Sequence, residues 1–469
     1  MGETAVKAEG TPAANPLGTE PVGKLMRKFA VPSVVSLVIN TLYNMVDQIF
    51  IGRGVGYLGN AATNVVMPLM TIIIAVGLLL GDGAASYTSL MLGRGKPEKA
   101  AQGIGNALTL IFVIGILFSV LFRIFIEPLC WLFGATEANI EYCLDYGSVI
   151  AVCSIMSLID TSFGSIFRAD GRPKITMAGL LIGCGTNFIL DPIFIFVCEW
   201  GVRGAALATV LGQIFNAAFF IVCLFHFKSV KLTKSCFRLK GDICRRVCSL
   251  GISSFITQVA VVIVMILMNN LFVKYGEESV YGADIPLAVY GIVMKIFLML
   301  NAFLTGIATG CQPIWGYNYG SEQYDRVKQC FRKALIIGFV ISMIGWFIFQ
   351  AFPEQLINIF GAESELYVEF AVMCFRVFLL CCFMTTFVVM IAIFFQALGK
   401  PIRAAFISLS RQVIFLIPAV IIFGRIGGVE GMLWGGPFAD TLAGIVALVL
   451  VGKSWKKLFN KEGTKENPG

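Results

Sequence analysis

Twelve apolar segments, each long enough to cross a bilayer, constrain the fold more than any other feature of this sequence. A membrane-spanning helix needs about 20 mostly apolar residues. The chain supplies such segments, separated by short polar turns, at 29–51, 62–92, 104–126, 142–167, 175–198, 204–226, 248–273, 285–315, 334–352, 368–396, 404–423 and 431–451. Hydrophobic residues form 57% of the chain and charged residues only 14%, far from the average soluble domain. The sequence therefore predicts an all-α polytopic membrane protein with twelve transmembrane helices.

The second half of the chain repeats the first. Matching stretches begin at Gly81 and Gly306, at Phe133 and Phe360, and at Phe167 and Phe395, with offsets of 225, 227 and 228 residues. Each half holds six spans, an even number, so both halves enter the membrane in the same direction and are expected to be related by an axis along its normal. The repeat predicts two pseudo-symmetric six-helix bundles around a central cleft.

These bundles define the predicted domains. The division is a polar N-terminal tail (1–24), an N-lobe of helices one to six (25–227), a basic linker (228–246), a C-lobe of helices seven to twelve (247–452) and a C-terminal tail (453–469). Of the 36 Lys and Arg residues, 28 fall in the termini and the loops on their side, whereas the opposite loops hold only Arg53, Arg203, Lys274 and Arg425. The positive-inside rule then predicts cytoplasmic termini, a cytoplasmic linker and a multi-pass protein of the cell's inner (plasma) membrane. The net charge of +8 is explained by this topology and by anionic lipid, so no nucleic-acid partner is expected.

Polar side chains recur at helical spacing inside three N-lobe spans. The sets are Asn40, Tyr43, Asn44 and Asp47 on helix one, Asn187 and Asp191 beside Pro192 on helix five, and Thr209, Gln213 and Asn216 on helix six. Each set shares one helix face, which should point into the protein. An aspartate near the bilayer centre costs about 2.5 to 3.5 kcal/mol on insertion scales, which favours a functional role. Alternatives remain for each residue alone: Asp47 as a helix-end carboxylate in interfacial water, Asn187 in a helix-to-helix hydrogen bond and Thr209 as a packing residue.

Four stretches of the N-lobe are similar to a known family. They are "NMVDQIFIG" in helix one, "FRADGRPK" after helix four, "NFILDPIFIF" in helix five and "GVRGAALATVLGQ" at the start of helix six. Together they resemble the multidrug and toxic compound extrusion (MATE) family, in its prokaryotic DinF-like and MepA-like branch, over roughly 25–451. The resemblance implies a secondary active antiporter that exports cationic, often aromatic compounds in exchange for H⁺ or Na⁺ by alternating access. It also implies a cation site at Asp47, Asn187, Asp191 and Thr209, and a bend at Pro32.

The C-lobe departs from other branches of that family. Their carboxylates on helices seven and ten have no counterpart here, and the C-lobe instead places Lys295, Arg376 and Arg411 inside spans. Such cations pair with other groups or line a water-filled cavity, so they are either structural partners of carbonyls and of carboxylates such as Asp440, or cleft residues. The candidate cleft residues are Asn40, Tyr43, Asn44, Asp160, Gln213, Asn216 and Lys295.

The expected coupling chemistry follows from two carboxylates in one desolvated pocket. They resist double ionisation and titrate as a unit, so a proton, Na⁺ or a cationic substrate competes for the same negative charge. A proton is slightly favoured over Na⁺, because Na⁺ also needs several well-placed neutral oxygens.

Other functions are less well matched by the sequence. A lipid-linked precursor flippase or a metabolite exporter of the same superfamily is the alternative, although a flippase should show more cationic cleft residues. An enzyme is not expected, because catalysis needs converging groups and the chain has one histidine, His226, and fourteen cysteines without a CxxC pair. No cofactor, and no metal beyond Na⁺, is expected. The expected partners are small organic cations, the coupling cation and the lipid bilayer, and the expected state is a monomer.

Overall fold

The fold is known from a computed structural model, which describes residues 15–459 apart from 56, 138, 225, 226, 228, 283 and 360–363. His226 lies outside the described residues. The described part of the chain is helical and contains no β-strand. Its first half forms α1 (Pro16–Thr19), α2 (Val22–Gly54), α3 (Tyr57–Gly93), α4 (Pro97–Leu132), α5 (Ile140–Val152), α6 (Ser154–Ala169), α7 (Pro173–Pro192), the π-helix η1 (Ile193–Val197) and α8 (Gly201–Leu224).

The second half follows the same order after a short 3₁₀ turn, η2 (Lys234–Phe237). It comprises α9 (Gly241–Glu277), α10 (Asp284–Gly320), α11 (Tyr324–Ala351), α12 (Pro353–Asn358), α13 (Glu365–Met373), η3 (Cys374–Phe378), η4 (Cys382–Met384), α14 (Thr385–Ala397), α15 (Pro401–Leu409), η5 (Ser410–Leu416), α16 (Ile417–Leu433) and α17 (Gly435–Phe459). Within the described residues, length and apolarity identify ten unbroken spans and two bent ones. The prediction of an all-α polytopic membrane protein is confirmed, and the count is twelve when each bent pair is one span.

The backbone carries the repeat found in the sequence. The two bent spans, α5 with α6 (56°) and α13 with α14 (46°), are the fourth span of each half. Left-handed backbone recurs at matching positions: Gly95 and Glu322, Gly171 and Gly399, and Gly201 and Gly428. Because side chains are strained in that region of φ, the chain uses glycine at five of these six positions.

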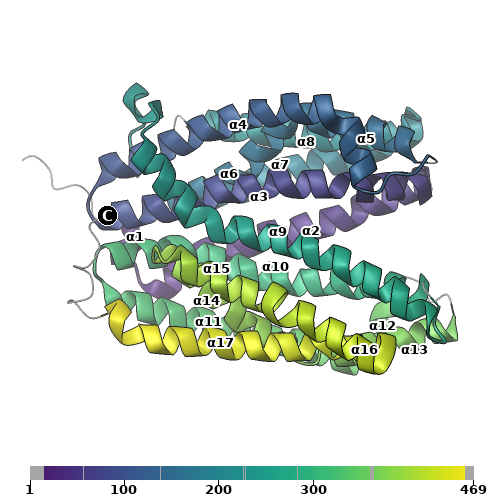
Figure 1. Ribbon diagram of the computed structural model, residues 1–469. Coiled ribbons are helices and arrows are strands. Elements are labelled where there is room, and N and C mark those ends of the chain that lie inside the picture. Colours follow the sequence, from purple (N-terminus) through teal and green to yellow (C-terminus); the bar gives the residue numbers. More distant parts are fainter. Residues whose placement is uncertain are drawn as a thin grey trace, which may run out of the picture.

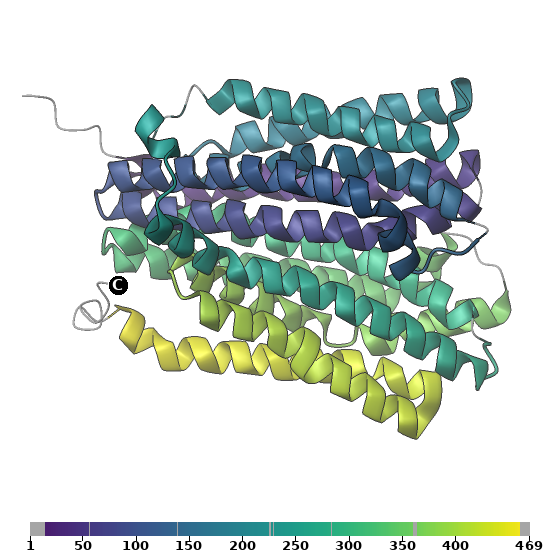
Figure 2. The ribbon, with the colours of Figure 1, turned by 45° about the horizontal axis from the view of Figure 1, so that its top comes forward.

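The helices of the two halves gather on opposite sides of the molecule (Figures 1 and 2). Helices α9 and α2 bridge these groups. Helix α9 contacts α3 and α4 of the first half as well as α15 and α16 of the second, and α2 contacts α10 and α11 of the second half as well as α7 of the first. In Figure 1, α9 crosses between the two groups, and the last turns of α17 lie at the same end of the molecule as α1. We call this the terminal end.

Contacts between the halves at the terminal end are close enough to exclude side chains. A Cβ on Gly251 of α9 would lie 1.8 Å from the carbonyl oxygen of Leu79 on α3. In return, a Cβ on Gly83 of α3 would lie 2.1 Å from the carbonyl oxygen of Val247 on α9. The two helices therefore touch backbone to backbone, the small-residue packing that membrane helices favour.

The contact between α2 and α10 has the same character. Cβ atoms on Gly306 and Gly310 of α10 would lie 2.6 Å from the Cα of Val34 and 2.5 Å from the Cα of Ala30 on α2. Pro32, the predicted bend, lies between these two residues inside α2, which is helical from Val22 to Gly54.

Polar bonds add to the contact between the halves. Asp82 of α3 accepts hydrogen bonds from Ser165 of its own half (2.7 Å) and from Ser254 of α9 (2.8 Å). Gln396 of α14 donates to Ser254 (3.0 Å), and Gln312 of α10 donates to Ser86 of α3 (3.0 Å). Asp82 is therefore a structural carboxylate of the interface, with each oxygen used.

Replacing Gly251 by alanine should destabilise the protein, because the new methyl group must push α9 away from the Leu79 carbonyl. Overpacking of this kind costs about 1–3 kcal/mol, and we expect a fall of several degrees in the midpoint of thermal unfolding in detergent. Gly452→Ala is the matched control, since a Cβ on Gly452 meets no atom within 4 Å. Equal midpoints for the two variants would contradict the close approach of α3 and α9.

Candidate cation-binding site

Helices α7 and α8 meet at a buried polar cluster. The Asn187 amide donates to Asp191 Oδ1 (3.3 Å), one turn further along α7, and to Thr209 Oγ1 on α8 (3.2 Å). Both Asn187 and Asp191 are 1% exposed. Asp191 is followed by Pro192 and by the π-helix η1, where proline and the wider turn interrupt the regular backbone ladder. The helix thus changes its hydrogen-bonding pattern directly beside the carboxylate.

Helix α2 supplies the second carboxylate. The Asp47 and Asp191 carboxyl groups lie within hydrogen-bonding reach of each other. One turn earlier on α2, the Tyr43 hydroxyl reaches Thr209, and so does the hydroxyl of Tyr146 on α5. The structure therefore brings Asp47, Asn187, Asp191 and Thr209 into one cluster, and their role as a cation site stays a prediction.

Three oxygens of this cluster are buried without a hydrogen-bond donor. They are Asp47 Oδ1, Asn187 Oδ1 and Asp191 Oδ2. None of the ion pairs between described residues includes Asp47 or Asp191. Buried acceptors and charges without partners are costly, so these oxygens leave the cluster with unused capacity to accept a hydrogen-bond donor or a cation.

The matching region of the second half is neutral. Aligning Pro192 with Pro418 and Gly201 with Gly428 places Val413, Ile417 and Gly436 where the first half has Asn187, Asp191 and Thr209. No carboxylate or amide remains there to bind a cation.

The second half instead contains a paired charge. Arg411 Nε donates to Asp440 Oδ1 at 2.6 Å, and both side chains are nearly buried. Thr385 lies close to Asp440, at the position that matches Ser157 of α6, which donates to Gln213 Oε1 (2.7 Å) in the first half. Arg411 also lies over the ring of Phe297 (5.5 Å). Arg411 is thus a structural partner of Asp440, one of the two roles that the sequence left open for it.

The remaining predicted residues lie at different depths. Asn44 is exposed and donates to the Asn40 carbonyl oxygen (2.7 Å). Asn216 donates to Asp160 Oδ1, so these two candidates are partners inside the first half. Lys295 is half-buried on α10, and Arg376 is exposed.

Sequence reasoning missed two members of these clusters, Tyr146 and Ser157. Both have polar neighbours at helical spacing, Tyr142 before Tyr146 and Ser154 and Thr161 around Ser157, but this spacing does not show which helix they contact. Their partners, Thr209 and Gln213, lie on α8, and only the packing of α5 and α6 against α8 brings them together.

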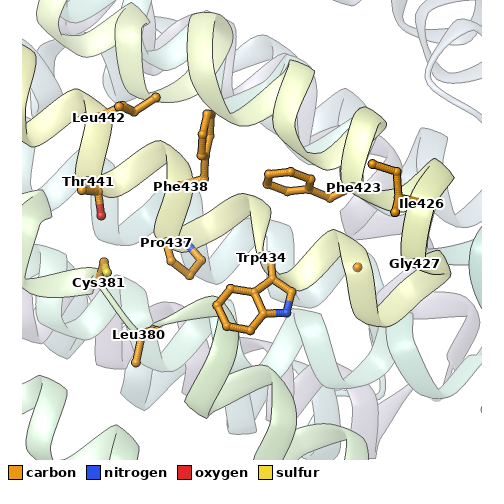
Figure 3. A pocket seen from close by; sticks show the side chains of 11 residues that line it. Leu380, Cys381, Phe423, Ile426, Gly427, Trp434, Pro437, Phe438, Thr441 and Leu442 are labelled. Atoms are coloured by element: carbon orange, nitrogen blue, oxygen red, sulfur yellow. The ribbon is translucent and has the colours of Figure 1, made fainter.

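Two pockets lie beside the bent spans, one in each half. The pocket beside the α13–α14 bend, of about 600 Å³, is walled by apolar side chains and the rings of Phe423, Trp434 and Phe438 (Figure 3). The pocket beside the α5–α6 bend, of about 470 Å³, is lined by Arg123, Asp145 and Arg203 among others. Neither includes a residue of the Asp47–Asp191 cluster. Asp145, a further acidic residue of the first half, therefore faces away from that cluster.

Comparison with known proteins agrees with this architecture. The sequence model of the MatE family matches residues 32–193 and 253–421, one segment in each half. The multidrug export protein MepA of Staphylococcus aureus (strain MRSA252) is 25% identical over 439 residues, which cover 92% of this chain and 94% of MepA. MepA of Staphylococcus haemolyticus is 23% identical over 440 residues, with 91% and 93% covered.

Solved structures show the same fold. The MATE multidrug transporter DinF-BH, solved in complex with a ligand, is 32% identical and superimposes with a TM-score of 0.88, covering 96% of this chain and 99% of that one. A MATE protein in complex with MaL6 has a TM-score of 0.89 at 23% identity, with 96% and 99% covered. With a family match over both halves and a fold shared along almost its whole length, this chain belongs to the MATE family of transporters.

Proposed function

We propose that this protein is a secondary active multidrug exporter that exchanges cationic, often aromatic compounds for H⁺ or Na⁺. The observation that carries the proposal is the pair of Asp47, which is half-buried, and Asp191, which is buried. Their carboxyl groups lie within hydrogen-bonding reach of each other and have no basic partner among the described residues. The similarity to the multidrug export protein MepA and to the multidrug transporter DinF-BH supports the substrate class.

Competition for one negative pocket couples the two fluxes. Two carboxylates this close cannot both ionise without repulsion, so the pair holds a coupling cation. A cationic substrate neutralises the same negative charge. Binding of the substrate therefore displaces the coupling cation, and binding of the coupling cation displaces the substrate. The exchange is driven only if each ligand prefers one conformation. A full reversal of a two-state equilibrium, from 1:99 to 99:1, needs a preference of about 10⁴-fold.

The unpaired oxygens suit both candidate ions. A proton shared between Asp47 and Asp191 pairs one oxygen of each. Na⁺ collects several oxygen ligands, and Asn187 Oδ1 and Thr209 Oγ1 are neutral oxygens beside the two carboxylates. We therefore keep H⁺ and Na⁺ as the two candidate coupling ions, and separate gradients distinguish them.

The proposed conformation follows from the contacts between the halves. With both termini in the cytoplasm, the terminal end faces the cell interior, and the backbone contacts of α3 with α9 and of α2 with α10 close the N-lobe on the C-lobe there. The cleft between the lobes then opens to the outside of the cell, so the proposed conformation is outward-open. Alternating access requires these contacts to separate in the inward-open state.

A flippase for a lipid-linked precursor is less well supported. Such a substrate carries a pyrophosphate, which calls for several unpaired cations. Arg411 is already paired with Asp440. Lys295 is then the remaining C-lobe candidate for a cation that could bind a pyrophosphate in the cleft.

Removing either carboxylate charge should abolish coupled export. Asp47→Asn and Asp191→Asn keep the side-chain volume, so we expect folded proteins whose gradient-driven export falls at least about tenfold. The measurement is uptake of a fluorescent organic cation by proteoliposomes under a pH gradient or a Na⁺ gradient alone. Asp145→Asn is the control, since Asp145 is exposed. Full gradient-driven transport by Asp47→Asn would refute the proposal for either ion.

Neutralising Lys295 should change the range of substrates more than ion coupling. Lys295 precedes Gly306 by about three helical turns, so it lies on the face of α10 that contacts α2. Lys295→Ala should alter relative transport rates within a panel of organic cations while gradient dependence persists. If Lys295→Ala lost ion-driven turnover but still bound substrate, the coupling site would lie in the C-lobe.

The topology predicts which loops can be labelled from outside the cell. In otherwise cysteine-free protein, a cysteine at Glu277 should react with a membrane-impermeant maleimide in intact cells. A cysteine at Lys96 should react only after the membrane is permeabilised. Labelling at Lys96 in sealed cells would invert the orientation.

A further inference from the structure

A further carboxylate, Asp160, lies inside the first half, and the proposed coupling mechanism does not use it. Thr209, Gln213 and Asn216 share one face of α8, and at 1.5 Å per residue Asn216 lies about 10 Å along the axis from Thr209. The Asn216 amide donates to Asp160 Oδ1 on α6. Between the two clusters, Gln213 accepts from Ser157. A continuous polar strip therefore runs along α8 from the Asp47–Asp191 pair to Asp160.

Asp160 has no neutralising charge nearby. None of the ion pairs between described residues includes it. The groups that face it are the Asn216 amide from α8 and the Cys184 thiol from α7. The acid that α3 turns toward α6 is Asp82, whose two oxygens accept from Ser165 of α6 and Ser254 of α9.

The partner of Asp160 is itself incompletely bonded. Asn216 is 2% exposed, and its Oδ1 has no donor. The fold makes room for this oxygen, because a Cβ on Gly179 of α7 would lie 2.3 Å from it. An ionised Asp160 accepts from the Asn216 Nδ2 but offers nothing to Oδ1. A protonated Asp160 can also donate its hydroxyl to Oδ1, so that acid and amide pair through two hydrogen bonds.

We propose that Asp160 and Asn216 form a second proton-binding site of the N-lobe, so that the transport cycle carries two cations. This inference rests on the proposed function, and it adds a titrating group to it. The carboxylate takes one proton from water to become the acid that pairs fully with Asn216, and it returns that proton to water in the opposite conformation. The Asp47–Asp191 pair, about 10 Å away along α8, holds the other cation.

The two sites should sense each other's occupancy. Charges about 10 Å apart at an effective dielectric constant near 20 change one another's affinity for a cation by about tenfold. A cation bound at one site adds a positive charge there and so lowers the affinity of the other site for its own cation. The two cations therefore bind one after the other.

The test compares proton release by purified wild type and Asp160→Asn in weakly buffered detergent when a fluorescent organic cation is added. The asparagine removes the titrating proton, and its amide can still pair with Asn216, so the fold is retained. We expect wild type to release more protons per bound substrate than Asp160→Asn, while the control Asp145→Asn matches wild type. Equal release by wild type and Asp160→Asn, including none from either, would overturn the inference.

A second measurement tests the inference even if Asp160→Asn is poorly expressed or binds the fluorescent cation weakly. In proteoliposomes with the potential clamped at zero and a gradient of one pH unit, two protons support about 100-fold accumulation and one proton about tenfold. We expect Asp160→Asn to lower the limit toward tenfold. An unchanged limit in Asp160→Asn would refute the second site and leave the proposed function intact, whereas an undiminished rate and limit of gradient-driven export in Asp47→Asn would refute the proposed function itself.

Discussion

Backbone contact between helices of different halves is the constraint on which the rest of this structure depends. In lipid, apolar side chains gain little by leaving one hydrocarbon surface for another, so helices associate through close packing and hydrogen bonds. Here Gly83 and Gly251 bring α3 onto α9, and Gly306 and Gly310 bring α10 onto α2. These contacts hold the halves at the terminal end, and they set the register in which α2 presents Asp47 to α7.

The halves share a backbone plan but treat buried charge differently. The second half neutralises Asp440 with Arg411. The first half keeps Asp47, Asp160 and Asp191 without a basic partner among the described residues. An internal ion pair balances its own charge, whereas a buried carboxyl group without a basic partner is neutral only when it holds a proton or another cation. Under the proposed function, the response to ions therefore lies in the first half.

Much of this architecture could be predicted from the sequence, because bilayer thickness imposes long apolar segments and a buried polar face imposes helical spacing. The spans and the polar stripes that hold Asp47, Asn187 and Thr209 follow from those two rules, and the repeat follows from the matching stretches of the two halves. The sequence offered Asp440 as a possible partner of the C-lobe cations but could not assign Arg411 to it. The contacts of Tyr146 and Ser157 and the pairing of Asp160 with Asn216 could not be predicted. Each depends on how one helix is rotated against another, which periodicity along a single helix does not encode.

Helix α2 carries both the backbone contact with α10 and the carboxylate that meets Asp191. Near its start, Ala30 and Val34 are pressed against α10, and further along Asp47 meets Asp191. Pro32 stands within the pressed segment, at the point where the helix lacks a backbone hydrogen bond and is most easily bent. A bend at Pro32 would change the direction of the rest of α2 relative to the segment that is packed against α10. It would swing the carboxylate and, in the same movement, change the surface that α10 rests on.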